Sequence, residues 1–178
     1  VKKKIHEEKL GESVEVNLTD YRDVRGQYDH IVSIEMFEAV GEKYWQLYFD
    51  TLKKNLKSNG NIGLQTITID NNFFKTYRKF PDFIQTYIFP GGMLLSSKLI
   101  GKHLESVGME VVSSKSFGDD YAETLSLWRG RFFKAWPHIK TLGFDDRFKR
   151  IWDFYLASCE GSFRGKRINV QQIVARHS

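Results

Sequence analysis

The chain has 178 residues, of which 41% are apolar and 15% aromatic, and a formal net charge of +5. This composition is typical of a folded domain and excludes a disordered chain, a collagen-like chain and a disulfide scaffold. The single cysteine, Cys159, excludes an internal disulfide and any metal site built from several cysteines.

The sequence contains no run of about 18 apolar residues, so we expect no membrane-spanning helix. The lysine-rich start lacks the apolar stretch of a secretory signal, and together with the single cysteine it predicts a cytoplasmic protein. Basic residues gather late in the chain. Such a cluster either attracts the phosphates of nucleic acid or of an anionic membrane, or simply forms the solvent-exposed faces of helices. We expect no nucleic acid as a partner, because no aromatic RNA-binding motif accompanies them. The basic residues are Arg129, Arg131, Lys134, Arg147, Lys149, Arg150, Arg164, Lys166 and Arg167.

The first part of the chain alternates between predicted strands and helices. Residues 14–18 alternate apolar and polar side chains and predict a short strand. Residues 28–34 predict a second strand, whose nearly continuous apolar end is typical of a strand covered on both faces. A helix is expected over about 41–56, ended by the Asn59-Gly60 pair, and β-branched residues predict a strand at 62–69.

The second part continues the alternation with longer helices. Residues 71–89 are rich in Phe and Tyr and predict helix in pieces, interrupted at Pro81 and followed by a turn at Pro90-Gly91-Gly92. The remaining predicted elements are a helix at 94–107 closed by Gly108, a strand at 109–117, helices at about 119–136 and 145–159, and a last strand at 168–175.

This order predicts an α/β fold in which crossover helices join the strands of one sheet, within a single domain over residues 1–178. The two helices before the last strand could form a helical lid over one end of the sheet. A nucleotide-binding α/β domain usually opens with a strand, a Gly-rich turn and a helix, and we find no such turn. The chain therefore looks like the later part of a larger domain.

Five segments of the chain, in order, carry a resemblance that covers nearly its whole length. They are residues 20–23, 28–41, 87–94, 121–128 and 155–164, which read DYRD, YDHIVSIEMFEAVG, YIFPGGML, YAETLSLW and YLASCEGSFR. Together they resemble the cyclopropane-fatty-acyl-phospholipid synthase family, which includes the mycolic acid cyclopropane synthases. The resemblance implies the C-terminal portion of a class I S-adenosylmethionine-dependent methyltransferase, a Rossmann-like fold. It also implies that the Gly-rich cofactor loop and an active-site cysteine lie upstream of this chain.

The resemblance implies a specific reaction and specific partners. The methyl group of S-adenosylmethionine would be transferred to the cis double bond of an unsaturated phospholipid acyl chain, forming a carbocation. A bound bicarbonate ion would then remove a proton from the new methyl group and close the cyclopropane ring, in a site dry enough to keep water from the cation. The implied protein is peripheral to the membrane that holds its substrate, and a homodimer is possible.

The same resemblance assigns four residues to the bicarbonate site. Glu38 would orient the ion, the Tyr121 hydroxyl would donate to it, and Ile67 would offer its main-chain carbonyl. Gln65 departs from the histidine of several relatives; its amide can donate a hydrogen bond but carries no charge at neutral pH, which puts a direct proton relay in doubt. Taken without the resemblance, Glu38 also fits a first-turn helix glutamate, and Tyr121 fits a residue packed on the core.

The resemblance also predicts residues of the cofactor site. Tyr21 and Arg22 match a loop that flanks the adenine, and Ser33 and Ile34 should line the cofactor pocket. The aromatic residues of 73–89 predict an acyl-chain channel or a membrane-contacting lid, or an ordinary core. The five histidines are scattered without ligand spacing, so we predict no metal, and Cys159 is interpreted as a packing residue.

Two alternatives stay open at this point. The first is a related lipid methyltransferase that gives a methyl-branched or hydroxylated chain, the latter when water captures the cation. The second is an inactive half-domain that binds a membrane or another subunit, which the missing Gly-rich turn favours. The 178 residues alone are expected to have little activity and weak affinity for S-adenosylmethionine.

Overall fold

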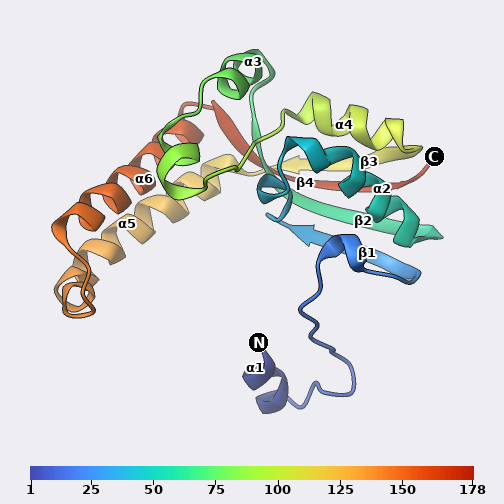
Figure 1. Cartoon of the computed structure of the whole chain (residues 1–178), viewed down its shortest axis with the longest axis horizontal. Helices are drawn as coiled ribbons and strands as arrows, with labels where there is room; N and C mark the ends of the chain where they lie inside the picture. Colours follow the sequence, from blue (N-terminus) through green and yellow to red (C-terminus); the bar gives the residue numbers. More distant parts are fainter.

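The computed structural model describes all 178 residues, and its centre is a four-stranded sheet (Figure 1). The strands are β1 (Tyr28–Ile34), β2 (Leu56–Ile69), β3 (Met109–Ser116) and β4 (Ile168–His177), and they lie in the order β1-β2-β4-β3. β1 and β2 are parallel, whereas β4 is antiparallel to both of its neighbours. This mixed sheet with helices between its strands confirms the predicted α/β fold.

Helices lie on both sides of this sheet. One face of the sheet is covered by α2 (Trp45–Asn55) and α4 (Ser97–Ser106). On the other face, α5 (Gly118–Thr141) and α6 (Asp146–Arg164) pack on each other and on β4. The short helical segments are α1 (Lys2–Glu7), η1 (Tyr21–Asp23), η2 (Phe37–Ala39), η3 (Glu42–Tyr44), α3 (Asn71–Lys79) and η4 (Ile84–Ile88). None of the helices is both long and apolar enough to cross a membrane.

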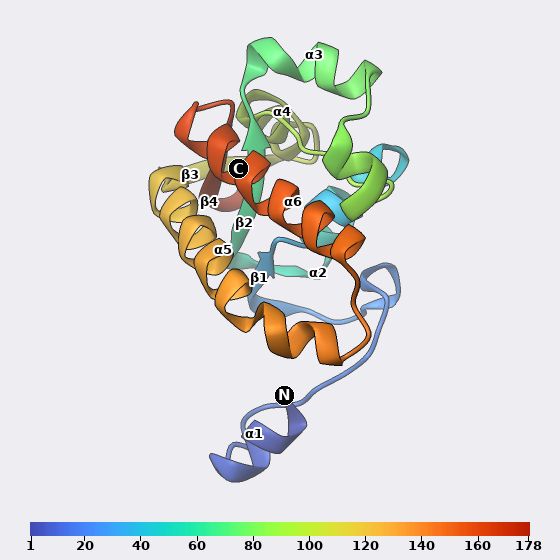
Figure 2. The same cartoon turned by 90° about the vertical axis from the view of Figure 1, so that its left-hand side faces the viewer.

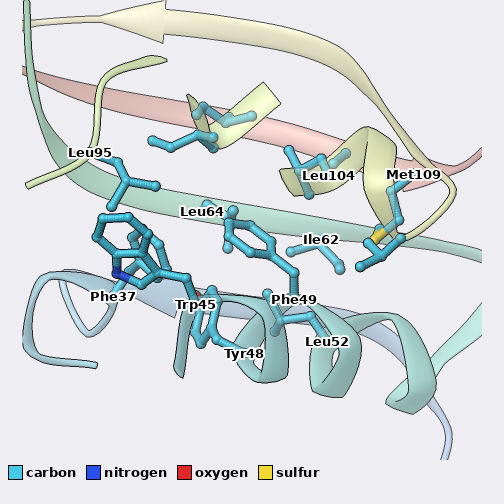
Figure 3. Packing of buried hydrophobic residues seen from close by; sticks show 14 of the residues in the cluster. Phe37, Trp45, Tyr48, Phe49, Leu52, Ile62, Leu64, Leu95, Leu104 and Met109 are labelled. Atoms are coloured by element: carbon cyan, nitrogen blue, oxygen red, sulfur yellow. The ribbon is translucent and has the colours of Figure 1, made fainter. Parts of the chain in front are cut away.

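The larger core lies between α2, α4 and the sheet, as Figure 3 shows. Tyr48 and Phe49 of α2 are fully buried there, and they meet Ile62 and Leu64 of β2. Apolar residues at helical spacing on α2 therefore face alternate residues of a strand, which is the pattern by which an amphipathic helix covers a sheet.

The smaller core joins α5 and α6 to the start of β4. Its fully buried members include Leu125 of α5, Phe163 of α6 and Val170 of β4. Figures 1 and 2 show the two helices side by side at the end of the sheet where β1 and β2 finish. This is the position predicted for a helical lid.

The strands and helices predicted after residue 18 are present in the structure, several of them with shifted ends, and four predictions are wrong. Residues 14–18 form no strand, because they pair with no other strand and Leu18 is fully exposed. Asn59-Gly60 does not end a helix: α2 stops at Asn55, and the pair lies inside β2. The helix expected from residue 94 begins only at Ser97, because Leu95 forms an isolated parallel bridge to Thr68.

The fourth error concerns β1, which is not covered on both faces. Ile31 and Ser33 face α2, but Val32 and Ile34 on the opposite face are 69% and 57% exposed. β1 is one of the two edge strands of the sheet, and α5 and α6 lie over β2 and β4 instead. The apolar residues of 28–34 therefore predicted the strand correctly, but they did not predict which of its faces is buried.

Candidate active site

The candidate site begins where β1 ends. Glu35 follows the last strand residue with a φ of +49°, a conformation that residues with a Cβ rarely adopt. Its main-chain N–H donates to the Gln65 carbonyl at 2.8 Å, which ties this turn to β2. Phe37, which is buried in the larger core, anchors the following turn of helix and so fixes the direction of Glu38.

Glu38 is held by the edge of β2. Its Oε1 accepts from the main-chain N–H of Ile67 at 2.5 Å and from the Thr66 hydroxyl at 2.9 Å. Its Oε2 is buried and has no hydrogen-bond partner. Burial raises the pKa of the Glu38 carboxyl, and the nearby Glu35 adds to this rise.

Tyr121 and Gln65 converge on Glu35 rather than on Glu38. The Tyr121 hydroxyl lies 2.8 and 2.9 Å from the two Glu35 oxygens, and the Gln65 amide donates to Oε1 of Glu35 at 2.9 Å. The Gln172 amide in turn donates to Gln65 at 2.9 Å. Burial, and then the hydrogen bond to the Glu35 carboxylate, raises the pKa of Tyr121 above its usual value.

The structure thus brings the four predicted residues together around the end of β1, but it adds a fifth that the sequence analysis did not single out. Glu35 is the acceptor that joins Gln65 to Tyr121. Ile67 contributes its main-chain N–H to Glu38, and its carbonyl lies 3.4 Å from the Thr66 hydroxyl. A second carboxylate directly after the apolar strand was the available sequence signal for Glu35.

An open hollow of about 330 Å³ is lined by residues of the same turn that carries Glu38. Tyr21 and Arg22, two of the predicted cofactor residues, line it, and Arg22 forms an ion pair with Asp20 at 2.6 Å. Its other lining residues are Asp20, Met36, Ala39, Val40 and Tyr44. The Tyr21 hydroxyl is buried without a partner. Flat rings and apolar walls are typical of sites that take the nucleoside end of a cofactor such as S-adenosylmethionine, and the assignment of Tyr21 and Arg22 to such a site stays a prediction.

The other two predicted cofactor residues do not line this hollow. The Ser33 hydroxyl lies beneath the sheet surface, where it accepts from the Tyr48 hydroxyl at 2.8 Å. This hydrogen bond holds the Tyr48 hydroxyl in place. Burial of the Tyr48 side chain raises its pKa to about 12. Ile34 ends β1 with its side chain exposed. Whether these two residues contact a cofactor stays a prediction.

Aromatic residues link the 71–89 segment to the helix pair. Phe83 packs edge-on against Phe154 with ring centroids 4.7 Å apart, and Phe89 meets Tyr155 at 6.0 Å. Burial raises the pKa of Tyr155 to about 12, and Glu35 is near enough to contribute to this rise. The packed aromatic rings therefore lead from the exposed segment toward the carboxylate cluster.

No group of three or more His, Cys, Asp or Glu side chains is arranged to hold a metal ion. Cys159 lies among the residues packed on the smaller core, and burial raises the pKa of its thiol to about 11. A thiol with such a pKa carries little thiolate at neutral pH, which agrees with a packing role.

Comparison with known proteins places these features in a family. The family model described as "Mycolic acid cyclopropane synthetase" matches residues 1–173. A tuberculostearic acid methyltransferase of Mycobacterium tuberculosis is 42% identical over 167 residues, which cover 92% of this chain and 38% of the relative. The cyclopropane-fatty-acyl-phospholipid synthase of Escherichia coli is 40% identical over 164 residues, which cover 92% of this chain and 41% of the relative. The chain therefore spans about 40% of the length of these relatives.

Solved structures agree with the sequence comparison. A crystal structure of the mycolic acid cyclopropane synthase CmaA1 complexed with SAH and CTAB superposes with a TM-score of 0.82 at 27% identity, over 96% of this chain and 65% of that chain. A putative sarcosine dimethylglycine methyltransferase from Galdieria sulphuraria has a TM-score of 0.81 at 14% identity and shows the same fold. The fold is that of the class I methyltransferases, and the chain belongs to the mycolic acid cyclopropane synthetase family.

Proposed function

We propose that this chain is the C-terminal portion of an enzyme that methylates the cis double bond of an unsaturated phospholipid acyl chain and closes a cyclopropane ring. The observation that carries the proposal is the cluster of Glu38, Gln65 and Tyr121 around the end of β1. The hollow lined by Tyr21 and Tyr44 lies at the same turn. Ligands of open α/β sheets bind at the carboxyl ends of the strands, where both features lie.

The proposed reaction has two steps, methyl transfer to the double bond and proton removal with ring closure. S-adenosylmethionine, when bound, supplies a methyl group on a positively charged sulfur that keeps the electron pair of the broken C–S bond. The π electrons of the substrate double bond form the new C–C bond, which leaves a positive charge on the other alkene carbon. A base then takes a proton from the new methyl group, and the C–H electron pair forms the second bond of the ring.

The residues of this chain would position the substrate and the base that accepts the proton. Tyr155, which is near Glu35 and packs against Phe89, would present an apolar ring beside the carboxylates, where water that would capture the cation must be kept out. Their ring faces also attract a positive charge. The resemblance predicts bicarbonate as the base, oriented by Glu38. The Tyr121 hydroxyl and the Gln65 amide, which would hold that ion, donate to Glu35 in this structure.

The relatives favour one second candidate, a methyl-branched product. The relative at 42% identity is a tuberculostearic acid methyltransferase, and another relative is a sphingolipid C9-methyltransferase. A methyl-branched alkene forms when the proton leaves from a neighbouring chain carbon rather than from the new methyl group. A hydroxylated chain forms when water adds to the cation.

The site assignment is tested by two conservative variants. Assays use the longer form, in which this chain is joined to the coding sequence upstream of it, because the chain spans only about 40% of its relatives. We expect Glu38→Gln and Tyr121→Phe each to lower turnover about a hundredfold, the usual contribution of a positioned acid or base group. Binding of S-adenosylmethionine, measured by calorimetry, should change little. Near-normal turnover in both variants would defeat the assignment.

We also propose that the protein lies peripherally on the membrane that contains its substrate. Phe80, Tyr87 and Phe89 are more than half exposed, and the exposed Phe154 of α6 packs on Phe83 of the same segment. Exposed aromatics with nearby Lys and Arg are typical of surfaces that insert at a lipid interface.

Membrane binding is measured by pelleting the chain with vesicles. We expect more protein to pellet with anionic than with zwitterionic vesicles, and less as the salt concentration rises, because salt screens the basic side chains. Tyr87→Ser should weaken pelleting, whereas the exposed Glu105→Gln on α4 should not. Pelleting that ignores both lipid charge and salt would contradict the proposal.

A further inference from the structure

We propose that the far end of the α5–α6 helix pair, residues 129–150, docks on the phosphates of anionic lipid headgroups. Figure 1 shows the two helices projecting from the sheet, with the connection between them at their far end, which we call the hairpin tip. The inference takes the membrane from the proposed function and concerns only how the protein is held there. Its test measures binding, so its failure can be told apart from failure of the proposed reaction.

The hairpin tip carries the whole net charge of the chain. Residues 129–150 contain seven Lys or Arg and two Asp, which give a formal charge of +5. The remaining 156 residues contain 20 basic and 20 acidic residues and are neutral overall. A positive charge gathered at one end of an otherwise neutral molecule turns that end toward an anionic surface.

Most of these cations have no acidic partner within the protein. Arg129 pairs with Asp153 at 2.5 Å, and Lys140 lies 3.9 Å from Asp146. Asp145, the other acidic residue of the tip, accepts from a main-chain N–H at the start of α6. Clusters of four to eight Lys or Arg on an amphipathic helix are typical of binding to anionic lipids. The basic residues of the tip that form no ion pair are Arg131, Lys134, Arg147, Lys149 and Arg150.

The basic residues that follow the tip differ in this respect. Arg164 pairs with Glu160 at 2.9 Å, and Lys166 pairs with Asp119. The sequence left open whether the late basic residues attract phosphates or only form exposed helix faces. The structure separates them, because Arg164 and Lys166 are matched within the protein whereas most cations of the tip are free to meet an external anion.

Apolar side chains stand at the turn of the hairpin tip. Leu142 and Phe144 are 63% and 43% exposed, on either side of Gly143, whose φ of +94° reverses the chain. Phe144 in turn packs on Phe148 of α6 with ring centroids 4.5 Å apart. Nucleic acid offers phosphates but no acyl layer in which such side chains can be buried, whereas a lipid interface offers both. The combination therefore favours a bilayer as the occupant.

Aromatic rings hold part of the charged surface in place. The Lys149 Nζ lies 5.5 Å from the ring centroid of Phe133 and 5.3 Å from that of Trp136. These cation–π contacts join α6 to α5 within the tip. Because Lys149 contributes to the packing of the two helices, it is left unchanged in the test.

The test compares two variants of the longer form that lose the same charge. Binding is measured by pelleting with vesicles of phosphatidylglycerol and phosphatidylcholine in equal parts, and with vesicles of phosphatidylcholine alone. The tip variant combines four changes at exposed, unpaired residues: Arg131→Gln, Lys134→Gln, Arg147→Gln and Arg150→Gln. The matched control combines four changes at exposed lysines elsewhere that also form no ion pair: Lys54→Gln, Lys98→Gln, Lys102→Gln and Lys115→Gln.

The position of the charges, rather than their number, should decide binding. We expect the partition coefficient of the tip variant on mixed vesicles to fall about 10²- to 10³-fold, because each Lys or Arg near an anionic surface contributes about fivefold. The control should stay within about threefold of the wild type, since charges far from the lipid are screened. Equal losses in the two variants would overturn the proposal, as would a tip variant that binds like the wild type. It would also be overturned if the tip variant lost affinity for a single-stranded oligonucleotide but not for vesicles.

Leu142→Ser tests whether the turn enters the lipid interface. High salt screens the headgroup phosphates, so the binding that remains there depends on buried apolar surface. We expect Leu142→Ser to lower this remaining binding about tenfold, the usual effect of one leucine. Leu47→Ser on α2, at a leucine that is also exposed, should leave it unchanged. A Leu142→Ser variant that binds like the wild type at every salt concentration would overturn the insertion of the turn.

Turnover separates this inference from the proposed reaction. On unsaturated phospholipid dispersed in neutral detergent, the tip variant should reach the wild-type kcat, whereas on mixed vesicles its KM should rise. A tip variant that is inactive on the dispersed substrate would show that the tip acts in the reaction and would overturn the docking role. Absence of methyl transfer by the wild type on both substrates would overturn the proposed function, and pelleting would still decide the role of the tip.

Discussion

Glu38 shows how a single buried carboxylate links the stability of this protein to pH. Its pKa is raised, first by burial and then by the nearby Glu35, while hydrogen bonds from Ile67 and Thr66 only partly offset this rise. A carboxyl with a raised folded-state pKa binds its proton more tightly in the folded than in the unfolded chain. Its contribution to stability is therefore present at low pH and is lost as the pH rises through the folded pKa.

We predict the consequence for Glu38→Gln, whose amide oxygen can still accept from Ile67 and Thr66. As the pH rises from the ordinary carboxyl value of 4.5 toward neutrality, the wild type should lose free energy of unfolding relative to the variant. Urea denaturation of the 178-residue chain at a series of pH values measures the difference. The exposed Glu105→Gln should show no such trend. A wild type that gains stability relative to Glu38→Gln over this range would contradict the assigned environment.

For single residues, the resemblance predicted four of the five members of the carboxylate cluster. The geometry of the fifth, Glu35, could not be predicted from the sequence. Glu38 and Tyr121 lie in matched segments, and Gln65 and Ile67 were assigned from the family positions to which they correspond. Glu35 also lies in a matched segment, but its role depends on a positive φ and on the approach of α5 across the end of the sheet. Neither feature leaves a pattern in the chain.

The β1–β2 pair illustrates the same limit for whole elements. The pattern predicted both strands, yet β2 begins at Leu56, six residues before the predicted start. Between the pairs Tyr28↔Leu56 and His30↔Asn61, β2 has five steps where β1 has two, which is a local irregularity of the ladder. The Asn59-Gly60 turn signal was therefore real but marks this irregularity, not the end of a helix.

Gly60 is predicted to be essential for this pairing. A Cβ at Gly60 would collide with the main-chain carbonyl of Asp29 on β1 and with the Leu56 side chain, and backbone cannot give way cheaply. We expect Gly60→Ala to lower the free energy of unfolding by about 1–3 kcal/mol, as is usual for overpacking. Gly101→Ala is the matched control, because nothing lies within 4 Å of its added Cβ in α4.

The control should behave in the opposite way. Alanine in a helix interior is favoured over glycine by about 1 kcal/mol, so Gly101→Ala should stabilise the chain. Chemical denaturation of the two variants beside the wild type measures both effects. Equal stability of Gly60→Ala and the wild type would show that β1 and β2 do not approach each other at this point as described.

The helices were predicted with different success for a physical reason. The spacing of apolar residues located α2 and the two long helices, because it follows from the faces they bury. Their ends were less visible: α5 runs five residues past its predicted end and contains Pro137 in its last turns. The helix pair continues where its residues pack on each other, and such tertiary contacts override local signals.

For the whole molecule, the distribution of exposed apolar surface matches a chain that spans only part of its relatives. Val32 and Ile34 present apolar side chains on the uncovered face of the edge strand, and Leu127 and Trp128 of α5 are also about half exposed. An apolar strand edge without a cover favours association. The composition and the order of strands and helices predicted the α/β class, but the coverage of each face could not be predicted without knowing what else packs there.

The most direct measurement of the central claim follows the fate of the transferred methyl group. The longer form and the 178-residue form are each given S-adenosylmethionine with a fully deuterated methyl group, together with unsaturated phospholipid vesicles, and the acyl chains are analysed by mass spectrometry and NMR. The account predicts that the longer form alone yields ring-containing chains that have lost the alkene and one of the three deuterium atoms, because the base takes a deuteron from the new methyl group. Chains that keep all three deuterium atoms, or that carry none, would contradict it.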